Sequence, residues 1–229
     1  MNYENLIKEF LTYFGGEDKG IRIFTSPGRV NLIGEHTDYN GGYVFPAALT
    51  LATTVVARAR DDRKIRLIAT DLKKMVEADL DNLEAYKDLK WGNYQLGVAD
   101  ELQKAGYKII GCDLMFEDKV PLGSGLSSSA AIEVATAIAL VSLGDQEYGK
   151  SKEIDMIEMA KISQIAEHNY VGVKCGIMDQ FASAMGKKDY AIFLNCRDLS
   201  YELVPVKLSD YSLLIGNTNK TRSLGEGKY

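Results

Sequence analysis

Residues 121–131 have the sequence Pro-Leu-Gly-Ser-Gly-Leu-Ser-Ser-Ser-Ala-Ala. This Gly/Ser loop leads into a run of small and apolar residues that predicts a long helix over 127–143. Such a junction brings backbone N–H groups, hydroxyls and the positive end of a helix dipole to one point, which suits a phosphate. The loop matches neither a Walker A motif nor a GxGxxG motif. The simpler alternative is a glycine-rich connection in which Ser127 serves only as the N-cap.

Composition narrows the class of protein. The chain has 229 residues, 46% of them hydrophobic, which is enough for one large domain or two small ones. A net charge of −5 and dispersed basic residues argue against a nucleic-acid surface. The sequence contains no run of about 18 apolar residues, so it predicts no membrane span. The N-terminus lacks a signal-peptide pattern. Three widely spaced cysteines, Cys112, Cys175 and Cys196, indicate reduced thiols in a cytoplasmic protein.

Hydrophobic periodicity predicts a mixture of helices and strands. The expected helices cover residues 6–14, 94–104, 127–143, 151–169 and a short segment from about 176. Residues 50–75 predict two strands joined as a hairpin by the polar turn at 61–63, and the helix at 151 is expected to begin with Ser151 as N-cap. Further strands are expected at 109–116, 190–194, 201–206 and 212–215. This order lacks regular βαβ alternation, so it favours an α+β fold over a doubly wound sheet.

The densest group of polar side chains lies between the glycines of residues 28–42. Charged residues among glycines indicate a backbone shaped for a ligand, and Glu35, His36 and Asp38 could accept hydrogen bonds from several hydroxyls of a sugar. The alternative is an exposed turn whose charges serve solubility. Metal binding by the same three side chains is conceivable, but their spacing matches no standard ligand pattern.

Other candidates carry weaker signals. Asp179 is expected in the first turn of a helix, where it could simply favour the dipole; near Arg29 it could orient or deprotonate a hydroxyl. Glu167 is typical of a solvated helix face, although it could reach Mg²⁺. Trp91 and Tyr94 form an i, i+3 aromatic pair, which fits core packing or stacking on a base.

These clusters, in this order, closely resemble the galactokinase family of the GHMP small-molecule kinase superfamily. The match is most specific over residues 28–42, Gly-Arg-Val-Asn-Leu-Ile-Gly-Glu-His-Thr-Asp-Tyr-Asn-Gly-Gly. Residues 121–131 resemble the superfamily's phosphate loop, and residues 176–180 its catalytic-acid segment. The similarity continues through Asn217, Thr218, Arg222 and Tyr229. The fold it implies is the GHMP N-terminal domain (ribosomal protein S5 domain 2-like), a mixed sheet flanked by helices.

The resemblance also implies a reaction, transfer of the γ-phosphate of ATP to the C1 hydroxyl of α-D-galactose. Asp179 would be the catalytic aspartate, and Arg29 would steady both it and the transferred phosphoryl group. The residues implied for galactose are Glu35, His36, Asp38, Gly176 and Tyr229. Those implied for ATP are Trp91, Tyr94, Pro121, Gly123, Ser124, Gly125, Leu126, Ser127, Ser128 and Ser129. Ser128 and Glu167 would lie near Mg²⁺.

The same resemblance sets expectations about extent and alternatives. Residues 1–205 would form the N-terminal domain, and 206–229 would begin a ferredoxin-like second domain. A third Gly-rich motif of the family is missing and Gly227 replaces a common serine, so we expect the 229-residue chain to be an inactive or weakly active fragment. Two other functions stay open: a non-catalytic galactose and ATP sensor, disfavoured by the intact Ser127–Ala130 run, and an N-acetylgalactosamine kinase. We expect a cytoplasmic monomer whose partners are small molecules.

Overall fold

The computed structural model describes residues 3–89, 91–208 and 211–216. Two β-sheets and five α-helices form the described part of the chain. The larger sheet contains β1 (Arg22–Asn31), β3 (Pro46–Ala59), β4 (Lys64–Ala69), β5 (Lys74–Asp79) and β6 (Cys112–Asp118). The smaller sheet contains β2 (Tyr43–Val44), β7 (Tyr190–Asn195) and β8 (Tyr201–Pro205). The α-helices are α1 (Tyr3–Phe14), α2 (Asn93–Lys104), α3 (Ser128–Gly144), α4 (Met156–Ala166) and α5 (Met178–Met185).

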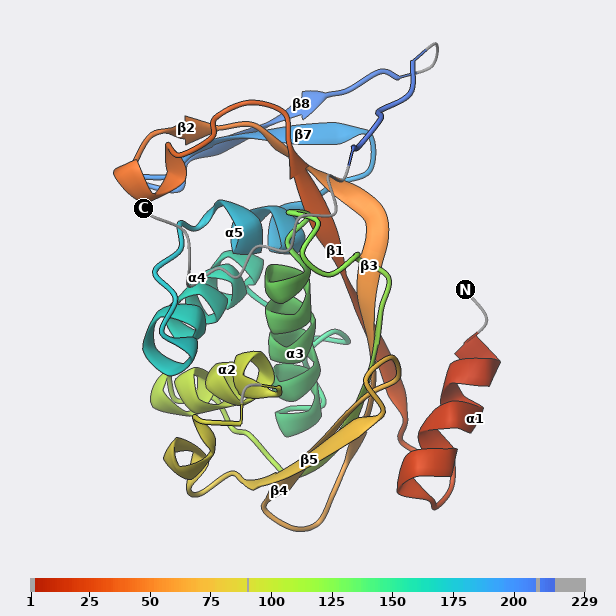
Figure 1. The fold of residues 1–229 in the computed structure, drawn as a ribbon. Helices are drawn as coiled ribbons and strands as arrows, with labels where there is room; N and C mark the ends of the chain where they lie inside the picture. Colours follow the sequence, from red (N-terminus) through yellow and green to blue (C-terminus); the bar gives the residue numbers. More distant parts are fainter. Residues whose placement is uncertain (1–2, 90, 209–210, 217–229) are drawn as a thin grey trace.

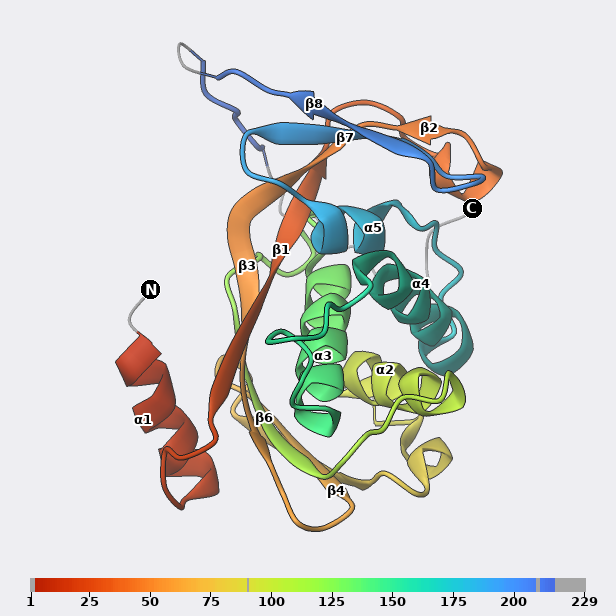
Figure 2. The same ribbon diagram turned by 180° about the vertical axis from the view of Figure 1, so that it is seen from behind.

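The elements form layers (Figures 1 and 2). Helices α2 to α5 cover one face of the larger sheet, and α1 lies alone on the other face. The strand order is β1-β3-β6-β4-β5, with β4 and β6 parallel and the other neighbours antiparallel. The smaller sheet, in the order β2-β7-β8, lies at the end of the molecule beside α5. This arrangement confirms an α+β fold with a mixed sheet flanked by helices.

The predicted hairpin at residues 61–63 is wrong. β3 and β4 are consecutive in the chain, yet β6 lies between them and pairs with both. Gly111, just before β6, passes closely under the turn: Arg60 N donates to Gly111 O at 2.8 Å, and a Cβ on Gly111 would lie 2.1 Å from Asp62 O. A glycine at this point therefore lets a distant strand enter between two neighbours.

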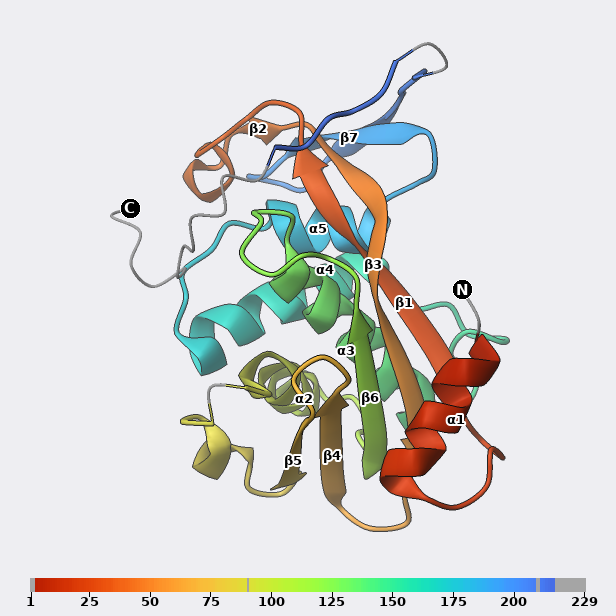
Figure 3. The same ribbon diagram turned by 45° about the vertical axis from the view of Figure 1, so that its right-hand side comes forward.

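The main core lies between the sheet and the helical layer, and α3 is its centre. Twelve of the seventeen α3 residues are buried, which fits a helix that is apolar on all sides. On the opposite face, α1 lies over the larger sheet (Figure 3). There it buries Leu6 and Phe10 against Val56, Ile68 and Met115. The predicted N-terminal helix is thus confirmed, and it ends at Gly15, whose φ of 67° suits glycine.

Three other expectations need correction. α4 begins at Met156, not at Ser151, because the Asp155 side chain caps it by accepting from the N–H groups of Ile157 and Glu158. The α-helix ends at Ala166 and continues as a π-helical turn over Glu167–Val171. Residues 212–215 form no strand: no strand of the described chain pairs with them, and Leu214 is 93% exposed. Over the same described ranges, no helix is long and apolar enough to cross a membrane.

Candidate active site

The Gly/Ser loop joins β6 to α3, and Ser127 at its end contacts Asp179 in the first turn of α5. Gly123 and Gly125 have φ values of 68° and 75°, and a Cβ on either would meet nothing within 4 Å. Glycine is therefore required at these two positions by the backbone conformation and not by crowding. Pro121, Gly123 and Gly125 are exposed. The loop thus presents exposed backbone before a 17-residue helix, as a phosphate cradle requires.

Ser127 does more than begin α3. Its φ of 62° and ψ of 47° place it in the left-handed region, which costs a residue with a Cβ on the order of 1 kcal/mol. The side chain makes no capping bond; Oγ donates to Asp179 Oδ2 at 2.7 Å. The alternative in which Ser127 serves only as an N-cap is therefore wrong. The strained serine directs its hydroxyl from the loop towards the acid.

Gly28 brings β1 against the same loop. A Cβ at this position would lie 2.6 Å from Leu126 O and 3.1 Å from the Val120 methyl groups. The pairing of β1 with β3 shifts register between Pro27 and Arg29, which marks a bulge. Arg29 N then donates to Leu126 O at 3.0 Å. The bulge and the glycine together fix the next side chain, Arg29, at the edge of the loop.

Arg29 and Asp179 form the central contact of the site. Arg29 Nη2 and Nε lie 2.6 and 2.8 Å from Asp179 Oδ1, and Arg29 Nη1 donates to Gly125 O at 2.6 Å. The Arg29 side chain is 12% exposed, whereas that of Asp179 is 30% exposed. The ion pair thus leaves the carboxylate within reach of a ligand. This geometry brings together three of the clusters that the sequence singled out: β1, the Gly/Ser loop and α5.

The turn over residues 31–42 has a tightly specified backbone. Gly34, His36 and Gly41 all have positive φ, and Thr37 Oγ1 lies 2.7 Å from the carbonyl oxygens of both Gly34 and Tyr43. His36 Nδ1 lies 2.7 Å from Tyr39 Oη. A solvated turn needs no such fixation, so this conformation supports a shaped binding turn over a purely solubilising one.

Asp38 and Gly176 touch each other. A Cβ on Gly176 would lie 1.9 Å from Asp38 Oδ2, so no larger residue fits beside this carboxylate. Burial, with the negative charge of Asp179 as a smaller cause, raises the pKa of Asp38 above its usual value. The turn and the start of α5 therefore form one continuous surface, with Asp38 close enough to Asp179 to interact electrostatically.

Glu35 and His36 lie on the same turn but are exposed. Glu35 Oε1 accepts from Asn31 Nδ2 at 3.0 Å, which ties it to the end of β1. The described residues contain no group of three His, Cys, Asp or Glu side chains arranged to hold a metal. The structure therefore gives the metal alternative for Glu35, His36 and Asp38 no support.

Glu167 is not a solvated face residue. It is 2% exposed, in the π-helical turn after α4, and Glu167 Oε2 accepts from Gln180 Nε2 at 2.8 Å. The same Nε2 donates to Glu133 Oε2 at 3.0 Å, and Glu133 is fully buried. Sequence reasoning missed Glu133, although it is the only charged residue in the otherwise apolar α3 and could have been found by that signal.

These two carboxylates lack a positive partner among the described residues. Burial and the charge of Glu167 raise the pKa of Glu133 well above its usual value, and burial raises that of Glu167 to about 7. Glu133 Oε1 and Gln180 Oε1 are buried and accept no hydrogen bond from the described chain. The carboxylate pair therefore has more acceptor oxygens than the described chain supplies with donors.

The aromatic pair is divided between two surroundings. Trp91 is partly buried and packs against the main core. Tyr94, on the first turn of α2, lies near the carboxylate pair: burial raises the pKa of its hydroxyl, with Glu167 and Glu133 as the next causes. The structure thus connects Tyr94 to the site and gives Trp91 a packing role. Stacking of either ring on adenine stays a prediction.

Two smaller points complete the site. His168 Nε2 lies 2.7 Å from Cys175 O and 3.1 Å from Cys175 N, so His168 holds the backbone just before Gly176. All three cysteines are free, as expected. Tyr229 and the segment from Asn217 that contains Thr218, Arg222 and Gly227 lie outside the described residues.

Comparisons with known proteins agree with this geometry. Residues 8–59 match the galactokinase galactose-binding signature, and residues 93–187 match the GHMP kinases N terminal domain. The chain is 47% identical over 229 residues to a galactokinase of Clostridium tetani and 44% identical over 229 residues to one of Bacillus subtilis. These matches cover 100% and 99% of this chain but 57% of each relative. The chain therefore spans little more than half the length of the curated relatives it matches.

Solved structures give the same result. Lactococcus lactis galactokinase complexed with galactose superposes with a TM-score of 0.90 at 42% identity, covering 100% of this chain and 58% of that one. The mevalonate kinase of Methanococcus jannaschii matches with a TM-score of 0.66 at 23% identity over 84% of this chain and 58% of its own. The second match shows a shared fold alone.

Proposed function

Because the chain belongs to the GHMP kinase superfamily and is similar along its whole length to the N-terminal portion of galactokinases, we propose that it supplies the galactose and phosphate sites of an ATP-dependent galactokinase. The reaction would transfer the γ-phosphate of ATP to the C1 hydroxyl of α-D-galactose, giving galactose 1-phosphate. The observation that carries this proposal is the joint contact of Asp179 with Arg29 and Ser127. In this contact a carboxylate lies at the edge of the Gly/Ser loop that we propose for phosphate binding.

In this proposal Asp179 receives or orients the proton of the attacking hydroxyl. Asp179 Oδ1 is engaged by Arg29 and Oδ2 by Ser127, so the carboxylate is held in one orientation before substrate arrives. Arg29 already contacts Gly125 O in the phosphate loop, so its positive charge would also lie near the transferred phosphoryl group. Positioning and charge stabilisation are the main requirements of phosphoryl transfer, and no covalent enzyme intermediate is needed.

Galactose would be bound by the turn over residues 31–42 and by the start of α5. Asp38, Glu35 and His36 are the proposed hydroxyl partners, and Gly176 lets the Asp38 carboxylate pack against the segment that leads into α5. Tyr229, outside the described residues, is proposed to complete this wall by resemblance. Carboxylates and imidazole can each pair with sugar hydroxyls, which gives the site its polar specificity.

ATP would be bound by the loop over residues 121–129, with Trp91 and Tyr94 proposed around adenine. Ser128 and Glu167 would hold Mg²⁺, and the buried Glu133 shares the Gln180 amide nitrogen with Glu167. When bound, Mg²⁺ would neutralise charge on the β- and γ-phosphates. Exposed N–H groups of the loop and the N-terminal end of α3 would then bind the remaining phosphate oxygens.

The proposal extends to the organisation of the chain. A boundary near residue 205 is supported by the end of β8 at Pro205 and by the lack of helix or strand in residues 206–208 and 211–216. We propose a cytoplasmic location, which the three free thiols support, and a monomeric state.

The decisive experiment is a coupled ADP-release assay on the complete gene product, with galactose and N-acetylgalactosamine as acceptors. We expect phosphorylation of galactose, and a loss of at least about a hundredfold in kcat for Asp179→Asn with galactose binding retained. The matched control is Asp145→Asn, the same change at the partly exposed residue that follows the C-terminal end of α3. Sugar binding without turnover would favour the sensor, and preference for N-acetylgalactosamine would change the substrate.

A further inference from the structure

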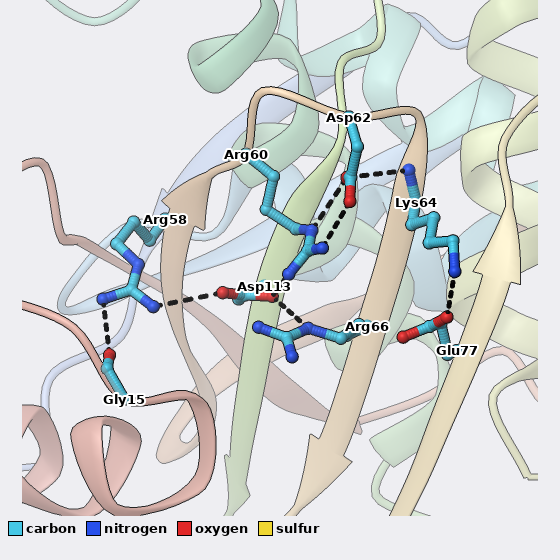
Figure 4. Close-up of polar contacts among 8 residues, drawn as sticks. All are labelled: Gly15, Arg58, Arg60, Asp62, Lys64, Arg66, Glu77 and Asp113. Atoms are coloured by element: carbon cyan, nitrogen blue, oxygen red, sulfur yellow. Dashed lines mark hydrogen bonds and ion pairs between the residues drawn. The ribbon is translucent and has the colours of Figure 1, made fainter.

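A group of arginines lies on the face of the larger sheet that carries α1, opposite the active site (Figure 4). The register pairs Arg58 of β3 and Arg66 of β4 with the same residue of β6, Asp113. All three lie in one row across the sheet, one step beyond the apolar row of Val56 and Met115 that α1 covers. The sheet therefore places charged side chains next to the C-terminal end of α1.

Asp113 is surrounded by positive charge. Its side chain is 2% exposed and lies 2.7 Å from Arg66 Nε, 3.1 Å from Arg60 Nη1 and 3.2 Å from Arg58 Nη2. One buried carboxylate thus faces three guanidinium groups, which are 16–22% exposed. Pairing of Asp113 alone needs only one of them.

The other acids near the group make no ion pair with Arg58 or Arg66 among the described residues. Asp62 pairs with Arg60, whose Nε donates to Asp62 Oδ1 at 2.8 Å. Asp61 also lines the pocket but is exposed, and Glu77, which faces Arg66 across the paired strands, bonds Lys64. Arg58 and Arg66 therefore have one carboxylate partner, Asp113, between them.

The uncompensated donors belong to Arg66. Arg58 Nη1 is used by the carbonyl oxygens of Gly15 and Glu17, at 2.9 and 3.0 Å, so Arg58 also fixes the end of α1. Arg66 bonds Asp113 through Nε, while neither of its Nη atoms has a hydrogen-bond partner among the described residues. The Phe14 ring, 4.9 Å from the Arg66 guanidinium carbon, holds that plane in place.

These residues line an open pocket with a volume of about 550 Å³. A planar guanidinium with two free Nη groups is matched by a phosphate or carboxylate, which accept two parallel hydrogen bonds. We propose that this pocket is a second, non-catalytic anion site that takes a small phosphoryl dianion, either inorganic phosphate or a phosphate monoester. Arg66 provides the bidentate contact, Arg58 and Arg60 add charge, and Phe14 forms the apolar edge.

Backbone amide NMR with two probes tests this proposal: inorganic phosphate, and glycerol 2-phosphate compared with glycerol, all at constant ionic strength. Saturable shifts at Gly15, Asp62 and Asp113 are expected with either phosphoryl probe and not with glycerol. A response to only one probe would identify the source of the phosphoryl group and still support the site. Amides of Gly123 and Gly125 report the phosphate loop separately.

Two substitutions and a control distinguish a site from a merely structural network. Arg66→Gln should abolish the saturable shifts at the pocket. Arg66→Lys, which keeps the charge beside Asp113 and so protects the fold, should weaken binding at least about tenfold because the fork is lost. Arg63→Gln, in the exposed pair with Asp81, should change nothing at the pocket. Shifts that do not saturate, or that persist unchanged in Arg66→Lys, would overturn the proposal.

Discussion

Gly176→Ala is the sharpest test of the proposed sugar site. The φ of Gly176 lies outside the left-handed region that disfavours side chains, so alanine meets no backbone penalty there. Its Cβ would instead lie 1.9 Å from Asp38 Oδ2 and 2.2 Å from Asp38 Cγ. An ordinary contact begins at 3.4 Å, so the carboxylate must move by about 1.5 Å, the difference between 3.4 and 1.9 Å. The substitution therefore displaces one acceptor without changing any charge.

The size of the effect follows from that displacement. A shift of about 1.5 Å takes an acceptor at about 2.8 Å from a sugar hydroxyl well beyond hydrogen-bond range. Losing a hydrogen bond to a charged group costs about 1.5–3 kcal/mol, which corresponds to roughly ten- to a hundredfold in Kd for galactose. Overpacking at the start of α5 adds about 1–3 kcal/mol of lost stability. Both effects should be measurable in a chain that still folds.

The assay is calorimetric titration of galactose, with unfolding by urea measured in parallel. Gly216→Ala is the matched control, since Gly216 is described, has no neighbour within 4 Å of a Cβ and no positive φ. Asp38→Ala combined with Gly176→Ala should restore part of the lost stability, because the closest clashing atoms are removed. Unchanged galactose affinity in Gly176→Ala would refute the reasoning that Asp38 is a sugar ligand positioned by this glycine.

Three other outcomes are expected. Ser127→Ala should lower kcat of the complete gene product about tenfold, because Asp179 Oδ2 loses its hydrogen bond. Ser127→Gly should lower kcat equally while relieving the backbone strain, and a kcat equal to that of the wild type in both variants would contradict this. Gly28→Ala should lower the unfolding free energy by about 1–3 kcal/mol, read in urea, because its Cβ would press on Leu126 O; an unchanged midpoint would disprove the close approach. The free energy of unfolding should fall as pH rises from about 4.5 through about 7, because the buried Glu167 still binds a proton that the unfolded chain has released. Glu133→Gln should make this fall with pH shallower, and a free energy of unfolding that rises with pH in the wild type would contradict the raised pKa values of the pair.

The sequence was most informative where function depends on local backbone. The loop at 121–131 could be predicted because Gly123 and Gly125 need positive φ, a property of single residues that survives any tertiary context. The turn that carries Asp38 was found for the same reason. Helices α1, α2 and α3 followed from apolar periodicity and composition over three turns or more.

The errors concern contacts between distant segments. Nothing in residues 50–75 indicates that β6 enters between β3 and β4. That arrangement depends on Gly111, which lies 52 residues after the end of β3 at Ala59 and 42 residues after the end of β4 at Ala69. Ser151 and Asp155 are both good N-caps, and in the structure it is Asp155 whose side chain accepts from the N–H groups of Ile157 and Glu158. Glu167 has an ordinary helical sequence context, and only the fold reveals that it is buried beside Glu133.

The site depends on three close contacts that no single motif contains. Gly28 lets β1 approach Leu126, Ser127 ties the loop to Asp179, and Gly176 lets α5 approach Asp38. Each contact joins two different segments, and together they connect the turn over residues 31–42, the Gly/Ser loop and Asp179 into one unit. A displacement at any one of these contacts should therefore shift the residues of the other two, because closely packed interiors have low compressibility and transmit strain. Gly28→Ala, far along the chain from Asp38, should for this reason weaken galactose binding as well as stability, and calorimetry on that variant can show whether the unit is coupled.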